Sequence, residues 1–144
     1  MPIAVNIKSE DTLRYTDNRD LIVHVKTSGV AILDLSGVPE KAGDWTRADA
    51  VFLIGPTMAD SHIKQYLKSL PMVVPSTVDV AANLDTSKSV GWGVDGFSSQ
   101  YDPTSDRTQV TATIVVKSKY SEVLRIAYLV DTIGWWDENA ISAF

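Results

Sequence analysis

The sequence predicts an all-β fold, a single antiparallel β-sandwich of jelly-roll type that spans residues 1–144 and carries one short α-helix. Three observations point to this class. Apolar residues alternate with polar residues along several segments, as they do in strands with one buried face. The most regular of these segments is rich in β-branched residues, which favour strands. The chain has 144 residues, of which 44% are hydrophobic and 22% charged, and this matches one globular domain with its own core.

The first half of the chain contains three segments with strand patterns. Residues 3–8 place apolar side chains at every second position, which predicts a first strand. Residues 21–35 contain two apolar runs around a short polar stretch that ends at Gly29. We expect a hairpin there, because Gly29 can supply the positive φ of a tight turn. Residues 50–54 form a continuous apolar run before a Gly-Pro pair, as is typical of a strand buried on both faces.

One short helix is expected over residues 58–70. Asp60 or Ser61 can cap its first turn, and Pro71 prevents it from continuing. Its apolar side chains have the spacing of one helix face and are Ile63, Tyr66, Leu67 and Leu70.

The clearest strand pattern lies at residues 109–117, where apolar and polar side chains alternate. Residues 122–131 alternate in a similar way after a polar turn, so the two segments are expected to pair as a long antiparallel hairpin. Apolar residues at helical spacing leave a helix over residues 122–133 as the alternative. The strand is preferred, because its hairpin partner precedes it and Gly134 follows it.

Two remaining segments have weaker patterns. Residues 85–106 are rich in Gly, Ser and Asp and include Pro103, which predicts either a long loop or a loop with a poorly formed strand. Residues 137–143 allow one further helical turn.

Charge and cysteine content exclude several classes of function. The chain has 13 basic and 18 acidic residues, a net charge of −5, and no cluster of Lys or Arg. We therefore expect no direct nucleic-acid partner. The absence of Cys excludes disulfides, thiolate metal sites and Cys nucleophiles. The first eight residues have no charged leader before a long apolar run, so we expect a protein made in a cytosol with no membrane partner.

Catalytic groups are scarce, and we expect no enzymatic activity. His24 lies within a strand pattern, where a side chain on a sheet face is the simplest interpretation. Asp60, Ser61 and His62 contain all three residue types of a hydrolase triad. Because they are adjacent in the chain, they cannot form a nucleophile, base and orienting group among themselves.

Three carboxylates in one segment raise the question of a metal site. Asp95, Asp102 and Asp106 could contribute oxygen ligands to Ca²⁺, but their spacing matches no known calcium loop. Turn formation explains them more simply. No phosphate-binding glycine motif occurs either, so we expect no cofactor and leave the metal question open.

The four Trp residues are the most informative side chains. They can close the open ends of a sandwich, since aromatic burial dominates core energetics. They can also anchor a partner, because Trp is enriched among the residues that contribute most to interfaces. The expected partner-binding residues are at the carboxyl end and are Trp135, Trp136, Ile141 and Phe144. Alternatively, Trp92, Phe97 and Tyr101 form a stacking platform for a sugar ring.

Together these features resemble a class of small, acidic, Cys-free all-β proteins that decorate or cement bacteriophage capsids. The resemblance rests on the paired segments 109–117 and 122–131, the short helix after Pro56 and the aromatic segment 135–144. It implies a non-enzymatic virion structural protein made in the host cytoplasm, with the major capsid protein or other assembly subunits as partner. Copies of the chain are expected to associate with one another. The alternative function is a carbohydrate-binding module.

Overall fold

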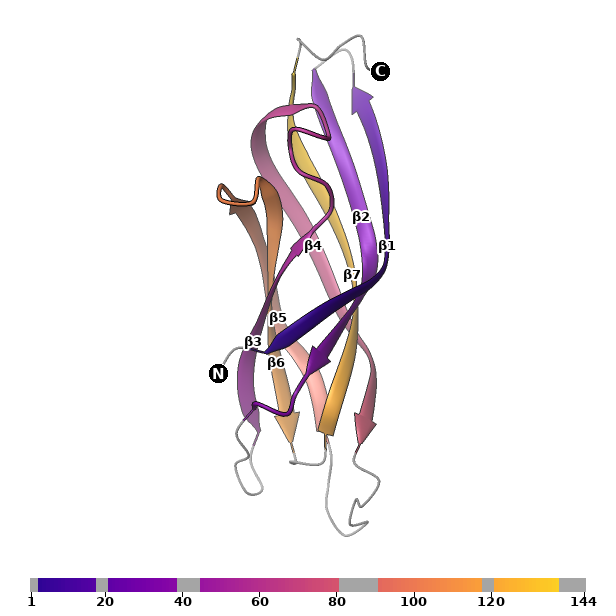
Figure 1. Ribbon diagram of the computed structural model, residues 1–144, viewed down its shortest axis with the longest axis vertical. Helices are drawn as coiled ribbons and strands as arrows, with labels where there is room; N and C mark the ends of the chain where they lie inside the picture. Colours follow the sequence, from indigo (N-terminus) through magenta and orange to yellow (C-terminus); the bar gives the residue numbers. More distant parts are fainter. Residues whose placement is uncertain (1–2, 18–20, 39–44, 81–90, 118–120, 138–144) are drawn as a thin grey trace.

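The structure is a computed structural model that describes residues 3–17, 21–38, 45–80, 91–117 and 121–137. This part of the chain is built of strands arranged in two sheets (Figure 1). One sheet has four strands in the order β1-β2-β7-β4, and the other has three in the order β3-β6-β5. The strands are β1 (Ala4–Asp17), β2 (Ile22–Asp34), β3 (Thr46–Ile54), β4 (Ile63–Val80), β5 (Gly91–Asp102), β6 (Arg107–Lys117) and β7 (Ser121–Trp136).

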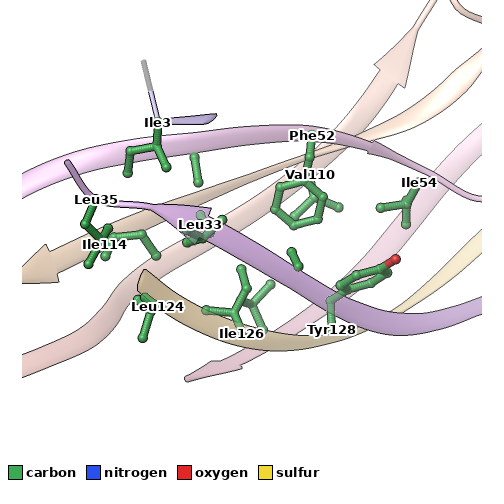
Figure 2. Close-up of a cluster of buried hydrophobic side chains, with 14 of the residues drawn as sticks. Ile3, Leu33, Leu35, Phe52, Ile54, Val110, Ile114, Leu124, Ile126 and Tyr128 are labelled. Atoms are coloured by element: carbon green, nitrogen blue, oxygen red, sulfur yellow. The ribbon is translucent and has the colours of Figure 1, made fainter. Parts of the chain in front are cut away.

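Every strand pairing is antiparallel, so the predicted all-β antiparallel class is confirmed. Both sheets contribute side chains to one core, which Figure 2 shows in close-up. In β6 every second residue from Thr108 to Val116 is buried, which confirms the alternation of segment 109–117. The largest core side chains come from β2, β3, β6 and β7 and include Leu33, Phe52, Ile54, Val110, Ile114, Leu124, Ile126 and Tyr128.

A second, smaller core lies where β2, β4 and β7 meet the chain between β3 and β4. The turn before β4 is held there because the Met58 amide donates to the Asp106 carbonyl, at 2.8 Å, and the Asp137 amide to the His62 carbonyl, also at 2.8 Å. The buried side chains of this second core are Val23, Val25, Met58, Ile63 and Trp136.

The predicted helix over residues 58–70 is wrong. The chain makes a turn up to His62, whose φ is +59°, and then enters β4. Two of the four register shifts in the pairing of β4 with β7 lie in this segment, between Ile63 and Gln65 and between Tyr66 and Lys68. Each shift moves the alternation of apolar and polar residues along the strand by one position. The apolar residues of this segment are therefore spaced as they would be on one face of a helix. Pro71 lies within β4, where an edge strand tolerates the missing N–H.

The predicted hairpin within residues 21–35 is also wrong, because β2 is one continuous strand. Gly29 does not have a positive φ. It allows a close approach instead: a Cβ added at this position would lie 2.6 Å from the Tyr128 hydroxyl oxygen. The glycine therefore serves packing across the sheet rather than a turn.

Segments 109–117 and 122–131 are strands, as predicted, but they do not form a hairpin. β6 pairs with β3 and β5, whereas β7 pairs with β2 and β4 in the other sheet. The helical alternative for residues 122–133 is excluded, since they belong to β7. The two strands face each other across the core, where the hydroxyls of Thr108 and Thr132 form a buried hydrogen bond of 2.8 Å.

Two further expectations need correction, and one is not tested. The run 50–54 lies in β3 but is not buried on both faces, because β3 is an edge strand and Val51 is 48% exposed. Within segment 85–106, residues 91–102 form strand β5 rather than a loop, with one register shift between Val94 and Gly96. All but the first residue of the predicted helical turn at 137–143 lie outside the described part of the chain.

Glu10 connects the two sheets through both of its carboxylate oxygens. It occupies a bulge in β1, beside Ser9 at a φ of +54°. Its Oε1 accepts from the Gly55 amide, after β3, at 3.1 Å, and its Oε2 accepts from the Tyr128 hydroxyl at 2.5 Å. Burial, followed by this hydrogen bond, raises the pKa of Tyr128 well above its usual value. The hydroxyl therefore remains a hydrogen-bond donor.

Candidate functional site

The two sheets present different outer faces, meaning the faces turned away from the shared core. The four-stranded sheet exposes large apolar side chains on its outer face from three of its strands. They are Leu13 and Tyr15 on β1, Leu70, Met72 and Val74 on β4, and Leu129 and Trp135 on β7. Isolated exposed apolar residues are common, but a group of them on one face marks an interaction site.

The centre of this face is an apolar patch formed across β2, β4 and β7. Met72 lies opposite Leu129, and Val74 lies opposite Ala127. Val30 of β2 flanks Ala127 on the other side. Leu70, Met72 and Val74 are each more than half exposed, and Leu129 is 46% exposed. We refer to Leu70, Met72, Val74, Ala127, Leu129 and Val30 as the central patch.

An ordered polar group lies at one end of the central patch. His24 Nδ1 is 3.2 Å from an Asp131 carboxylate oxygen, and Asp131 lies opposite Leu70. The Tyr15 ring stacks on the His24 ring with 4.7 Å between centroids, and Lys26 Nζ lies 5.5 Å from the Tyr15 centroid. This group fixes His24 on a sheet face, as its strand pattern predicted.

The outer face of the three-stranded sheet is mainly polar, and its polar side chains bond to one another. Arg47 of β3 forms an ion pair with Asp95 of β5 across β6. Thr113 donates to Asp49 at 2.8 Å, and the side chains of Gln100 and Gln109 are joined at 3.0 Å. A face whose polar groups bond laterally in this way is suited to contact with water.

Of the predicted partner-binding residues, Trp135 and Trp136 point to opposite sides of β7, as neighbours on a strand must. Trp135 is 39% exposed on the outer face, whereas Trp136 is 5% exposed and packs in the second core. Trp136 is therefore not accessible to a partner in this fold, whereas the partner contact of Trp135 stays a prediction. Ile141 and Phe144 lie outside the described residues.

The predicted sugar-stacking residues share one face of β5. Trp92, Phe97 and Tyr101 lie opposite residues of β6 whose side chains are buried, so they face the core side at the sheet edge. Trp92 and Phe97 are 41% and 44% exposed. Tyr101 is less available: its ring stacks on Tyr66 at 5.6 Å, and its hydroxyl donates to Asp106 at 2.7 Å. This hydrogen bond raises the pKa of Tyr101.

The three carboxylates considered for a metal site each have separate partners. Asp95 pairs with Arg47, and Asp102 accepts from the Ser105 hydroxyl at 2.6 Å. This hydrogen bond lowers the pKa of Asp102. Asp106 accepts from Tyr101 and from the Ala59 amide. Among the residues that the structure describes, no three His, Asp or Glu side chains gather as a possible metal site.

Asp60, Ser61 and His62 lie in the turn before β4. Ser61 is 2% exposed, whereas Asp60 is exposed, so these two side chains lie on different sides of the turn. The Ser61 carbonyl accepts from Arg14 at 3.4 Å, which ties the turn to β1. The contacts in this segment therefore support the turn.

Sequence reasoning missed the central patch. Leu70, Met72 and Val74 belong to the continuous apolar run of residues 70–74, which is consistent with a strand, and this run was the available signal. The predicted helix stop at Pro71 concealed it. Because β4 is an edge strand, it continues through this proline.

Comparisons of the chain with protein-family models, with curated proteins and with solved structures find no match. Within the described ranges, there is no helix long and apolar enough to cross a membrane.

Proposed function

We propose that this chain is a non-enzymatic structural subunit of a virion, a decoration or cement protein that binds the major capsid protein or other assembly subunits. The observation that carries this proposal is the contrast between the two outer faces. The four-stranded sheet exposes an apolar face, and the three-stranded sheet opposes it with a laterally bonded polar face. Such a molecule is suited to lie with one face against an assembly and the other in water.

The proposed mechanism is passive. Rigid sheets present Trp135 and the neighbouring apolar side chains, and the area that they bury on binding stabilises the assembled state by linkage. An exposed Trp at the edge of an apolar face is a typical anchor of such an interface. The protein is then found in the virion after synthesis in the host cytoplasm.

The strand order supports assignment to the jelly-roll type. β7 returns to pair with β4, while β5 and β6 pair with each other in the facing sheet. β4 to β7 therefore follow the order of a Greek key. Jelly rolls are built from Greek keys distributed over two sheets.

The proposal is tested by binding to particles. Purified particles that lack the chain are mixed with the purified chain, and the bound fraction is measured after sedimentation. We expect Trp135→Ala to weaken binding about tenfold or more, the usual effect of losing a buried Trp anchor. Trp45→Ala is the matched control, since Trp45 is 50% exposed and precedes β3 in the other sheet. Equal binding of all three proteins, or no binding by the unmodified chain, contradicts the proposal.

The second candidate is a carbohydrate-binding module, favoured by the shared orientation of Trp92 and Phe97 on an edge strand. Exposed aromatic rings in a row suit stacking against sugar rings. The measurement is a titration of Trp fluorescence with a panel of oligosaccharides. If this function holds, Trp92→Phe removes most of the fluorescence change while Trp135→Phe leaves it unaltered. Absence of any saturable change with the unmodified chain excludes the candidate sugars.

A further inference from the structure

We propose that a second copy of this chain covers the central patch, and that a two-fold axis relates the two copies and crosses the strands at the level of Tyr128. The inference deepens the proposed function by naming one occupant of the apolar face. It relies on that function only for the premise that the face is covered. The argument comes from the order of side chains along β7 and from its register with β1, β2 and β4.

The outer face of β7 carries a short pattern that is complementary to itself. Its side chains are Arg125, Ala127, Leu129 and Asp131, because alternate residues of a strand share one face. The two apolar residues lie on either side of position 128, and the opposite charges lie one step further out. If the direction of the strand is reversed about position 128, Arg125 takes the place of Asp131 and Asp131 takes the place of Arg125.

A two-fold axis in the interface plane, perpendicular to the strands, performs this reversal. It places β7 of one copy antiparallel over β7 of the other, so that residues equidistant from position 128 meet. Ala127 then packs on Leu129 of the second copy, and Arg125 meets Asp131 at both ends. An interface in which the same surface is used twice must be complementary to itself in this way.

The register of β4 extends the apolar part of this contact. Val73 lies opposite Tyr128, and Met72 and Val74 lie on either side of it. The same axis therefore places Met72 of one copy on Val74 of the other. Both side chains are more than half exposed in the single chain, so the contact removes apolar surface from water.

β1 supplies a second pair of opposite charges. Gly29 lies opposite Tyr128, and Ser28 and Val30 flank it on β2. Asp11 lies opposite Ser28, and Lys8 lies opposite Val30. The axis that matches β7 thus also brings Lys8 of one copy toward Asp11 of the other.

The competing arrangement has its two-fold axis parallel to the strands. It places equal positions of β7 together, so that Arg125 meets Arg125 and Asp131 meets Asp131. Like charges that face each other across an interface are strongly unfavourable. The charges therefore select the antiparallel arrangement.

The two charged side chains can take part although they already have contacts within the chain. Asp131 is 3.2 Å from His24 Nδ1, and a carboxylate has about four acceptor positions. Arg125 also interacts within the chain, and a guanidinium has five N–H donors. Each can therefore add an intermolecular bond.

The first test compares two matched substitutions by sedimentation equilibrium of the full chain. Val74→Asp places a carboxylate in the proposed interface, whereas Val51→Asp places one on the outer face of the other sheet. The two valines are 51% and 48% exposed and both lie on edge strands. We expect the unmodified chain and Val51→Asp to form dimers of equal affinity, and Val74→Asp to weaken the dimer at least tenfold.

The second test exchanges the charges. Arg125→Asp and Asp131→Arg should each weaken the dimer, because like charges then meet at both ends of the interface. A mixture of the two variants should form heterodimers, since every contact in the mixture again joins opposite charges. The double variant should also recover dimer formation. Thermal unfolding of each variant confirms that it is folded.

Several results overturn the proposal: an unmodified chain that remains monomeric at about 1 mM, equal effects of Val74→Asp and Val51→Asp, or failure of the mixed variants to associate. The outcomes also separate this inference from the proposed function. A monomeric chain that binds particles contradicts only the two-fold pairing. A dimeric chain that does not bind particles contradicts only the function as a virion subunit.

Discussion

Trp136→Ala is expected to lower the free energy of unfolding by about 3–5 kcal/mol, the usual cost of removing a large aromatic side chain from a core. Trp136 is 5% exposed and packs with Val23, Val25, Met58 and Ile63. This small core holds the turn before β4 against β2 and β7. Its remaining side chains cannot fill the volume of an indole, so a cavity adds to the lost apolar burial. Urea denaturation followed by tyrosine and tryptophan fluorescence measures the change.

Trp135→Ala is the control, because it makes the same substitution at the adjacent residue of the same strand. Trp135 is 39% exposed on the outer face, so its loss should change the free energy of unfolding by less than about 1 kcal/mol. The two variants thus separate a residue that stabilises the fold from one available to a partner. Equal destabilisation by both would contradict the placement of these side chains.

The strand content could be predicted from the sequence, because alternation is a local signal. β6 is the clearest case, since its buried residues are those that the two-residue period selects. The segment after Pro56 could not be predicted in this way. Its two register shifts depend on the pairing of β4 with β7, a partner more than 50 residues away in the chain. Without knowledge of that partner, the same residues fit helical spacing.

The sequence also could not predict which strands pair with each other. Adjacent strands usually pair, which is why β6 and β7 were expected to form a hairpin. Their inward side chains, Thr108 and Thr132 among them, instead meet across the core. The role of Gly29 shows the same limit, because only the position of Tyr128 on the neighbouring strand reveals why a glycine is required. Tertiary contacts decide both features.

Prediction of the candidate site also required the pairing and register of the strands. The sequence identifies Trp135 and Trp136 as opposite-facing if they lie in a strand, but not which of them faces the core. That choice follows from the register of β7, in which Trp136 shares a face with the buried residues Val130 and Thr132. The central patch likewise becomes visible only once β2, β4 and β7 are aligned.

Glu10→Ala is expected to lower the free energy of unfolding by about 3 kcal/mol, because it removes two hydrogen bonds to a carboxylate, each contributing about 1.5 kcal/mol or more. The Tyr128 side chain is buried, so its hydroxyl then has no replacement acceptor from water. The Gly55 amide, at the end of β3, loses its acceptor as well. The measurement is again urea denaturation at neutral pH.

A double-mutant cycle with Tyr128→Phe tests whether the two residues act through one hydrogen bond. If they do, Glu10→Ala is less harmful in the Tyr128→Phe background by about 1–2 kcal/mol, because no buried hydroxyl remains without a partner. The contact with the Gly55 amide persists in Tyr128→Phe, so the remaining effect of Glu10→Ala measures the connection from β1 to β3. Additive effects of the two substitutions would show that Glu10 and Tyr128 stabilise the fold independently. The bulge at Lys8–Asp11 would then have no role in joining the sheets through Tyr128.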